Sequence, residues 1–283
     1  MALRRPSHEP YGAPASPYPG GVIDTHCHLT FPKLAHRIDE VLAGCREQGV
    51  RGVITIATTS SGCEENLAIA QSHEGVWCSA GVHPLYADEE VDWASVRKVG
   101  EDPLCVAWGE LGLDNFHKKP PIEVQRTILE DQLAQLESWS EQGLAKPVVL
   151  HCRDAYDELI PMLTASKLPA DRFVFHCFTG TPENARAILD FGAMLSFTGV
   201  VTYKNAAEVA EAATLVPEDR IMVETDAPYL SPEPVRGSHP NEPRNVVHVA
   251  RFISERRGVN PEAFEQVLDA NAERFFGITL PES

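Results

Sequence analysis

The sequence lacks any apolar run long enough to cross a membrane, and it is short of positive charge. No stretch approaches the roughly 20 consecutive apolar residues that span a bilayer, so we expect a soluble protein. Its 24 lysines and arginines are outnumbered by 41 aspartates and glutamates, which gives a net charge of −17. Such a surface repels polyanions at long range and argues against an extended basic surface for nucleic acid. It does not exclude a small cationic site.

The seven cysteines form no CxxC pair, and the N-terminus carries no apolar run typical of an export signal. We therefore expect a cytoplasmic protein with reduced thiols. Cys27, Cys152 and Cys177 each follow a histidine directly. Successive side chains of a strand face opposite sides, so these thiols should be buried rather than act as metal ligands.

The first 21 residues hold five prolines and three glycines, which is typical of a disordered tail. No other boundary or internal repeat is visible. We therefore predict a tail over residues 1–21 and a single domain over residues 22–283.

Eight apolar segments rich in β-branched residues recur along this domain and predict strands over residues 21–26, 52–57, 76–83, 104–110, 147–152, 172–177, 193–199 and 220–226. Segments with helical periodicity separate most of them, and two more helices end the chain. Strands alternating with helices over about 250 residues predict an α/β fold, the (β/α)8 TIM barrel, with a doubly wound open sheet as the alternative.

Polar residues collect where the predicted strands end, at the barrel rim on which active sites of this fold lie. They are His26, His28, His83, Glu110, His151, His176 and Asp226. Each alone could be an ordinary hydrogen-bonded residue or a helix cap. Apart from His83, which is surplus to the ligand set, the four other histidines and the two carboxylates exceed the three protein ligands of a usual catalytic zinc site, and they predict a binuclear metal site at the C-terminal ends of the strands. Glu110 lies halfway round the rim and is the candidate bridge.

Several motifs resemble, in order and spacing, those of the TatD family of metal-dependent deoxyribonucleases in the amidohydrolase superfamily. The resemblance covers about residues 22–277 and rests on VIDTHCHL, AGVHP, GELGLD, HCRDA, HCFTG, SFTGVVTYKNA, ETDAPYLSP and NEPRN. It implies a barrel with two divalent ions that hydrolyses nucleic acid phosphodiesters, typically from the 3′ end. One departure is Asn115, where the family commonly has an aromatic residue.

The resemblance also implies a division of the metal ligands. It assigns His26, His28 and Asp226 to one ion, His151 and His176 to the other, and Glu110 to the bridge. As working hypotheses, Asp226 also takes a proton from the attacking water, and Glu224 orients a ligand imidazole. His83 either donates a hydrogen bond to the scissile phosphate or leaving group, or is a turn residue fixed by the proline that follows it.

Cationic and aromatic residues near the rim are candidates for substrate binding. Arg153, Lys204 and Arg244 could meet phosphates, although surface roles fit them as well. The aromatic candidates for base stacking are Phe116, Phe178, Phe197, Tyr203 and Tyr229, with Tyr229 and Phe178 favoured because each lies just beyond a predicted ligand.

The predicted function is thus a divalent-metal-dependent 3′–5′ exodeoxyribonuclease acting on DNA ends or single strands through metal-activated water. One alternative is a metal hydrolase of a lactone, amide or aminoacyl ester. Another is a degenerate site in a binding module. The two ions could be Mg²⁺, Mn²⁺ or Zn²⁺. We expect no membrane association and no obligate protein partner.

Overall fold

The computed structural model describes residues 21–281, and its centre is one parallel sheet of eight strands. Neighbours in the sheet are neighbours in the sequence, from β1 to β8. The predicted (β/α)8 barrel is confirmed, whereas the predicted tail lies outside the described residues except for Gly21. The strands are β1 (Asp24–Cys27), β2 (Val53–Thr55), β3 (Val76–Ala80), β4 (Cys105–Asp114), β5 (Val148–Arg153), β6 (Phe173–Phe175), β7 (Met194–Phe197) and β8 (Ile221–Val223).

The barrel is closed by hydrogen bonds between the end of β1 and the segment that follows β8. The Asp226 N–H donates to the His26 carbonyl at 2.9 Å, and the His28 N–H donates to the Ala227 carbonyl at 2.7 Å. This seam joins the first and last thirds of the chain at the rim where the predicted ligands lie.

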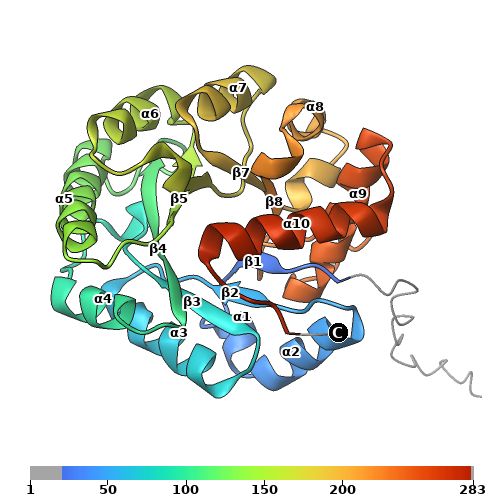
Figure 1. Cartoon of the computed structure of the whole chain (residues 1–283), viewed down its shortest axis with the longest axis horizontal. Helices are drawn as coiled ribbons and strands as arrows, with labels where there is room; N and C mark the ends of the chain where they lie inside the picture. Colours follow the sequence, from blue (N-terminus) through green and yellow to red (C-terminus); the bar gives the residue numbers. More distant parts are fainter. Residues whose placement is uncertain (1–20, 282–283) are drawn as a thin grey trace, which may run out of the picture.

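Ten α-helices of the described chain surround the strands (Figure 1). They are α1 (Pro32–Ala35), α2 (Ile38–Glu47), α3 (Ser60–Ser72), α4 (Trp93–Gly100), α5 (Ile122–Glu141), α6 (Tyr156–Ala165), α7 (Pro182–Phe191), α8 (Ala207–Leu215), α9 (Val246–Arg257) and α10 (Pro261–Phe276). Sequence signals fix their ends: in α7, Pro182 occupies the first turn, Thr181 caps the Asn184 N–H, and Gly192 ends the helix at a φ of 109°. No described helix has the length and apolar composition of a membrane span.

Helix α10 lies across the N-terminal end of the barrel (Figure 1). The Asp269 carboxylate accepts from the Ile23 N–H at 2.9 Å, and the Asn271 amide donates to the Ile221 carbonyl at 2.8 Å. An inner apolar core fills the lumen beneath this helix, and its members include Ile54, Ile56, Val149, Met222, Phe276 and Leu280. The lower lumen is therefore packed, which leaves the C-terminal end for polar residues.

Strand β4 continues four residues beyond its predicted end at Glu110. It passes through Gly109 and Gly112, which have φ values of +131° and +147°. A Cβ atom at Gly112 would lie 1.9 Å from the His151 carbonyl oxygen, so only glycine allows β4 to approach β5 this closely. The strand thereby carries Asp114 to the same rim as Glu110.

Candidate metal centre

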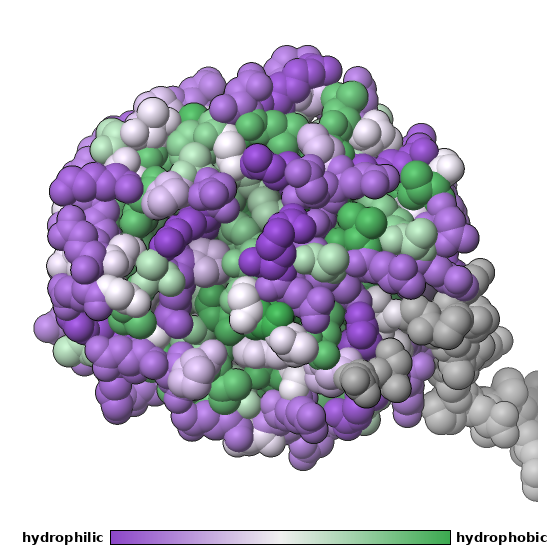
Figure 2. Space-filling model, viewed as in Figure 1, coloured by the Kyte–Doolittle hydropathy of each residue, from purple (hydrophilic) through white to green (hydrophobic). Residues whose placement is uncertain are grey.

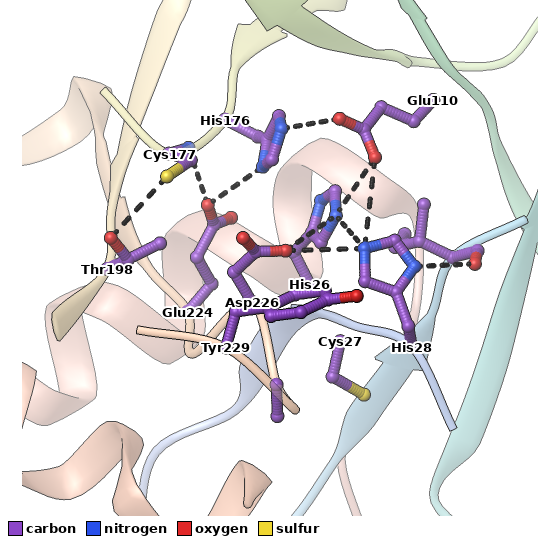
Figure 3. Close-up of polar contacts among 12 residues, drawn as sticks. His26, Cys27, His28, Glu110, His176, Cys177, Thr198, Glu224, Asp226 and Tyr229 are labelled. Carbon is purple, nitrogen blue, oxygen red and sulfur yellow. Dashed lines mark hydrogen bonds and ion pairs between the residues drawn. The ribbon is translucent and has the colours of Figure 1, made fainter. Parts of the chain in front are cut away.

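The C-terminal rim gathers all six predicted ligands, and five of them line one cavity of about 480 Å³, while His26 is fully buried beside it. Five of them are shown in Figure 3, where their side chains converge. They come from the C-terminal halves of β1, β4 and β5 and from the segments that follow β1, β6 and β8, and they are His26, His28, Glu110, His151, His176 and Asp226. The structure brings these residues together; their action as ligands stays a prediction.

Three donor atoms from the barrel seam form the first group. The Nε2 atoms of His26 and His28 lie 3.3 Å apart, and Oδ1 of Asp226 lies 3.7 Å and 3.3 Å from them. Donor atoms that each sit about 2.1 Å from one ion are separated by about 3.0–3.4 Å, so this group fits a divalent cation.

The carboxylate of Glu110 lies between this group and a second one. Its Oε2 atom is 3.3 Å from Nε2 of His26. Its Oε1 atom is 2.9 Å from Nδ1 of His151 and 2.6 Å from Nε2 of His176. The two oxygens of one buried side chain thus face different sets of donor atoms, which is the arrangement that a bridging carboxylate requires.

Glu224 lies behind His176 rather than in the cavity. Its Oε1 atom is 3.2 Å from Nδ1 of His176 and also accepts the Cys177 N–H at 2.6 Å (Figure 3). An imidazole whose Nδ1–H is held in this way presents Nε2 to the cavity. Although Glu224, His26 and His176 also satisfy the spacing of a metal group, protein donors already occupy the Glu224 carboxylate.

Asp114 plays the equivalent part for His151, and the sequence analysis missed it. Its Oδ2 atom is 3.0 Å from Nε2 of His151, while Oδ1 accepts the N–H groups of Phe116 and His117 at 2.9 Å and 2.8 Å. The contact leaves Nδ1 of His151 free to face Glu110. The available signal was the motif GELGLD, because residues 110 and 114 share one face of a strand.

Burial and ion pairing shift the pKa values of the site in opposite directions. Burial alone would raise the pKa of Glu110, but His176, His83 and His26 lower it well below its usual value. The pKa of His176 is raised well above its usual value, because Glu110 and Glu224 outweigh its burial. The carboxylates are therefore ionised and the cluster holds protons on imidazole, which a divalent cation would displace on binding.

His83 is oriented as a hydrogen-bond donor. Its Nδ1 atom accepts the Leu85 N–H at 3.0 Å, so in the neutral ring the proton lies on Nε2. That Nε2 atom is 3.1 Å from Nδ1 of His151 and 3.4 Å from Oε1 of Glu110. Burial lowers the pKa of His83 to about 4, despite the opposing effect of Glu110, so the ring is neutral at pH 7.

Two exposed aromatic side chains line the cavity. Phe116 is 57% exposed and Tyr229 is 48% exposed. The Arg153 guanidinium lies 5.0 Å from the centre of the Phe116 ring and also lines the cavity. The favoured candidate Phe178 is only 1% exposed and packs against Tyr156, so the prediction that it stacks on a base is wrong.

The remaining substrate candidates do not line this cavity. Phe197 is buried, and the Tyr203 hydroxyl donates to the Ser231 carbonyl at 3.0 Å. Lys204 is exposed away from the lining residues. Arg244 is paired with Glu242, a carboxylate that also binds Arg37. Its charge is therefore balanced within the protein, and the structure does not support a phosphate contact for it.

Cys27 points away from the histidines on either side of it (Figure 3). Its sulfur lies 3.6 Å from the Ile54 carbonyl, in the outer core. Cys152 and Cys177 do line the cavity, but burial raises the pKa of both thiols, and the Cys177 sulfur contacts the Thr198 hydroxyl at 3.6 Å. The thiols are thus protonated and poor metal ligands.

A (β/α)8 barrel with histidines and carboxylates at the C-terminal rim defines the class of metal-dependent barrel hydrolases. Residues 23–277 match the family described as TatD related DNase, so the chain belongs to the TatD family. It is 36% identical over 260 residues to the metal-dependent hydrolase YcfH of Escherichia coli K12, covering 91% of this chain and 96% of that protein.

Two further proteins of the TatD family are similar to this chain. The 3′-5′ ssDNA/RNA exonuclease TatD of Erwinia billingiae is 36% identical over 265 residues, covering 90% of this chain and 98% of that protein. The crystal structure of YjjV, a TatD homolog from Escherichia coli K12, superposes with a TM-score of 0.82 at 27% identity, covering 91% of this chain and 98% of that chain. The chain is a metal-dependent hydrolase of this family.

Proposed function

We propose that this hydrolase is a 3′–5′ exonuclease for single-stranded nucleic acid that works with two divalent ions. The position of Glu110 carries the proposal, since its two oxygens face His26 on one side and His151 and His176 on the other. The similarity to the TatD exonuclease of Erwinia billingiae supports the choice of substrate. We keep the cytoplasmic location and the absence of an obligate protein partner as predictions.

The six rim residues would hold the ions, with His26, His28 and Asp226 on one and His151 and His176 on the other. Glu110 would contact both. Two bound divalent ions would supply an activated water and neutralise charge on the phosphate. Mg²⁺, Mn²⁺ and Zn²⁺ all accept this mixture of imidazole and carboxylate donors.

Asp226 would accept the proton of the attacking water, and His83 would act as a hydrogen-bond donor. Asp226 is partly exposed to the cavity, and His28 and His26 lower its pKa against the effect of burial. Its carboxylate is therefore ionised and can accept a proton from the attacking water. The water oxygen bonds to phosphorus as the bond from phosphorus to the 3′ oxygen breaks. The Nε2–H of His83 would donate to the phosphate or to that leaving oxygen.

The cavity mouth would bind the end of a nucleic acid strand through base stacking and one cationic side chain. Phe116 and Tyr229 expose rings on which bases can stack, and Arg153 beside Phe116 can meet a flanking phosphate. Because this footprint is small and the whole chain is acidic, we expect activity to fall only gently with added salt. A steep fall would indicate many phosphate contacts instead.

A substrate panel tests this function. Purified full-length protein is incubated with single-stranded DNA, duplex DNA, RNA and small esters and lactones, in Mg²⁺, Mn²⁺ or Zn²⁺. We expect release of mononucleotides from single strands, abolished by a chelator and blocked by a 3′-terminal modification but not by a 5′ one. Phe116→Ala and Tyr229→Ala should raise KM for oligonucleotides about fivefold or more, in line with the loss of a stacking contact.

Three outcomes would contradict the proposal. Chelator-resistant cleavage would remove the ions from the mechanism. Turnover of an ester or lactone with no nuclease activity would assign the centre to carbonyl substrates. Inactivity on every substrate, with the ions demonstrably bound, would indicate a binding module.

A further inference from the structure

A second cavity, of about 670 Å³, lies at the N-terminal end of the barrel, away from the candidate metal centre. Its walls come from the segments that lead into β5, β6 and β8, from the start of β7 and from the end of α10. Figure 2 views this end of the molecule and shows strongly hydrophilic side chains beside apolar ones near its middle. The volume lies within the range of about 300–1,000 Å³ typical of small-molecule sites.

Positive charge dominates this cavity although the chain as a whole is strongly acidic. Its lining contains two carboxylates, Asp171 and Asp219, and four cationic side chains, Lys146, Arg172, Arg220 and Arg274. Within residues 21–281, none of these four cations has a carboxylate oxygen within the 4.0 Å of an ion pair. The cavity therefore keeps a local excess of positive charge in a chain whose net charge is −17.

Three of the cations are fixed in place by neutral acceptors. Lys146 donates to the Cys105 carbonyl at 2.7 Å, and Arg220 donates to the Gly192 carbonyl at 2.6 Å. Arg274 donates to the Asp219 carbonyl at 2.8 Å. These bonds orient the side chains without balancing their charge. Each guanidinium has five N–H donors, so several remain for an anionic ligand.

Arg172 differs from the other three because its side chain has no hydrogen bond to a described residue. It is partly buried where the chain enters β6. A planar guanidinium with all its donors free matches the paired oxygens of a phosphate.

Apolar side chains complete the cavity. Met194 is buried at the start of β7, and Phe275 is partly exposed while its ring packs edge-on against Phe276 at 5.0 Å between centres. From this combination of uncompensated cations and an accessible ring, we propose that the cavity binds a nucleoside phosphate, with the phosphates at Arg172 and the base near Phe275. A long strand fits less well, because it needs a basic track that this acidic surface lacks.

Isothermal titration of ADP, and separately of inorganic phosphate, into the full-length protein in Mg²⁺ tests the proposal. Three variants are compared with the wild type: Arg172→Gln, Asp226→Asn at the metal centre, and Arg186→Gln as the matched control. Arg186 is an exposed arginine of α7 that pairs with Glu183 and lies outside the cavity lining. Circular dichroism melting checks that each variant folds.

We expect Arg172→Gln to weaken ADP binding about tenfold or more, the effect of losing a charge-assisted hydrogen bond, while Arg186→Gln changes nothing. Arg172→Gln and Arg186→Gln should have equal hydrolase activity. Asp226→Asn should bind ADP as the wild type does, because its cavity still contains Arg172. Phosphate should bind more weakly than ADP and with the same dependence on Arg172.

Other results would overturn the proposal. One is the absence of any binding at about 5 mM ADP, a concentration at which even weak, millimolar binding is detected. Another is ADP binding that Asp226→Asn abolishes and Arg172→Gln leaves intact. Phosphate binding as tight as that of ADP would remove the base from the assignment. If Arg172→Gln weakened only the binding of an oligonucleotide, the cavity would belong to a nucleic acid strand.

Discussion

At the C-terminal end of the barrel, buried carboxylates and histidines pack against one another, whereas at the N-terminal end apolar side chains fill the lumen and the charges lie at its edge. Buried carboxylates show the contrast directly. The pKa of Glu110 is lowered by three histidines against its burial, while burial raises the pKa of Asp269 to about 6 despite Arg51. One end is thus built to hold negative charge for a cation, and the other is built mainly for stability.

The largest expected effect is a loss of catalysis on substitution of a residue at the C-terminal end of the barrel. Asp226→Asn removes the proposed proton acceptor and should reduce kcat about 10³-fold or more, with little change in thermal unfolding. Nuclease assays and melting curves measure the two quantities. The control is Asp39→Asn, since the Asp39 side chain is 97% exposed. A wild-type rate in Asp226→Asn would refute the role of Asp226.

Two phenylalanines, one at each end, give the next test. Phe276 is 5% exposed in the inner core, so Phe276→Ala should lower the free energy of unfolding by about 3–5 kcal/mol. Phe116→Ala at the other end should lower it by less than about 0.5 kcal/mol while weakening substrate binding. Urea unfolding measures both. Equal losses of stability would show that the two ends of the barrel do not differ in packing.

A third test concerns the residues that orient the imidazoles. Asp114→Asn can place its amide N–H opposite Nε2 of His151, which disfavours the tautomer that presents Nδ1 to the cavity. We expect the dissociation constant for Mn²⁺ to rise about 10–100-fold, as found for partners of metal-bound histidines. Titration calorimetry with Mn²⁺ measures this constant for Asp114→Asn, with Asp39→Asn as the control. An unchanged Mn²⁺ affinity would show that Asp114 only caps its own turn.

The last test concerns how stability at the N-terminal end of the barrel depends on pH. Folded Asp269 keeps its proton up to about pH 6, whereas its ordinary pKa is 3.8, so the folded state binds more protons between these values. The contribution of Asp269 to stability is therefore complete at low pH and is lost as the pH rises through about 6, by about 3 kcal/mol in total. Asp269→Asn should remove this slope from urea unfolding measured between pH 4 and 7. Parallel profiles for the variant and the wild type would contradict the assignment.

Periodicity predicted the barrel because each strand is apolar and each helix has one apolar face, and these patterns depend on local sequence. It also placed six polar residues at one rim, since the ends of parallel strands coincide. It stopped β4 at Glu110, whereas the strand continues to Asp114 by passing through Gly109 and Gly112. Their actual role is to let β5 approach, which depends on a neighbouring strand, and Asp114 was missed for that reason.

Side-chain environments were harder to predict than positions. Phe178 follows a candidate ligand in the sequence, yet it turns into the layer of Tyr156 and Phe197, and position alone does not give that direction. Arg244 is cationic and near the rim, but Glu242 takes up its charge. Whether a charge is free or paired depends on contacts that neither spacing nor composition encodes.

The seam between His26 and Asp226 also determines when the first ligand group can form during protein synthesis. A ribosome that has released only the first 200 residues holds a chain with five of the six candidate ligands and no partner for the edge of β1. The first group of His26, His28 and Asp226 can therefore be complete only after the last strand has emerged and joined the first. Metal binding at this group would then report that the eighth strand has joined the first.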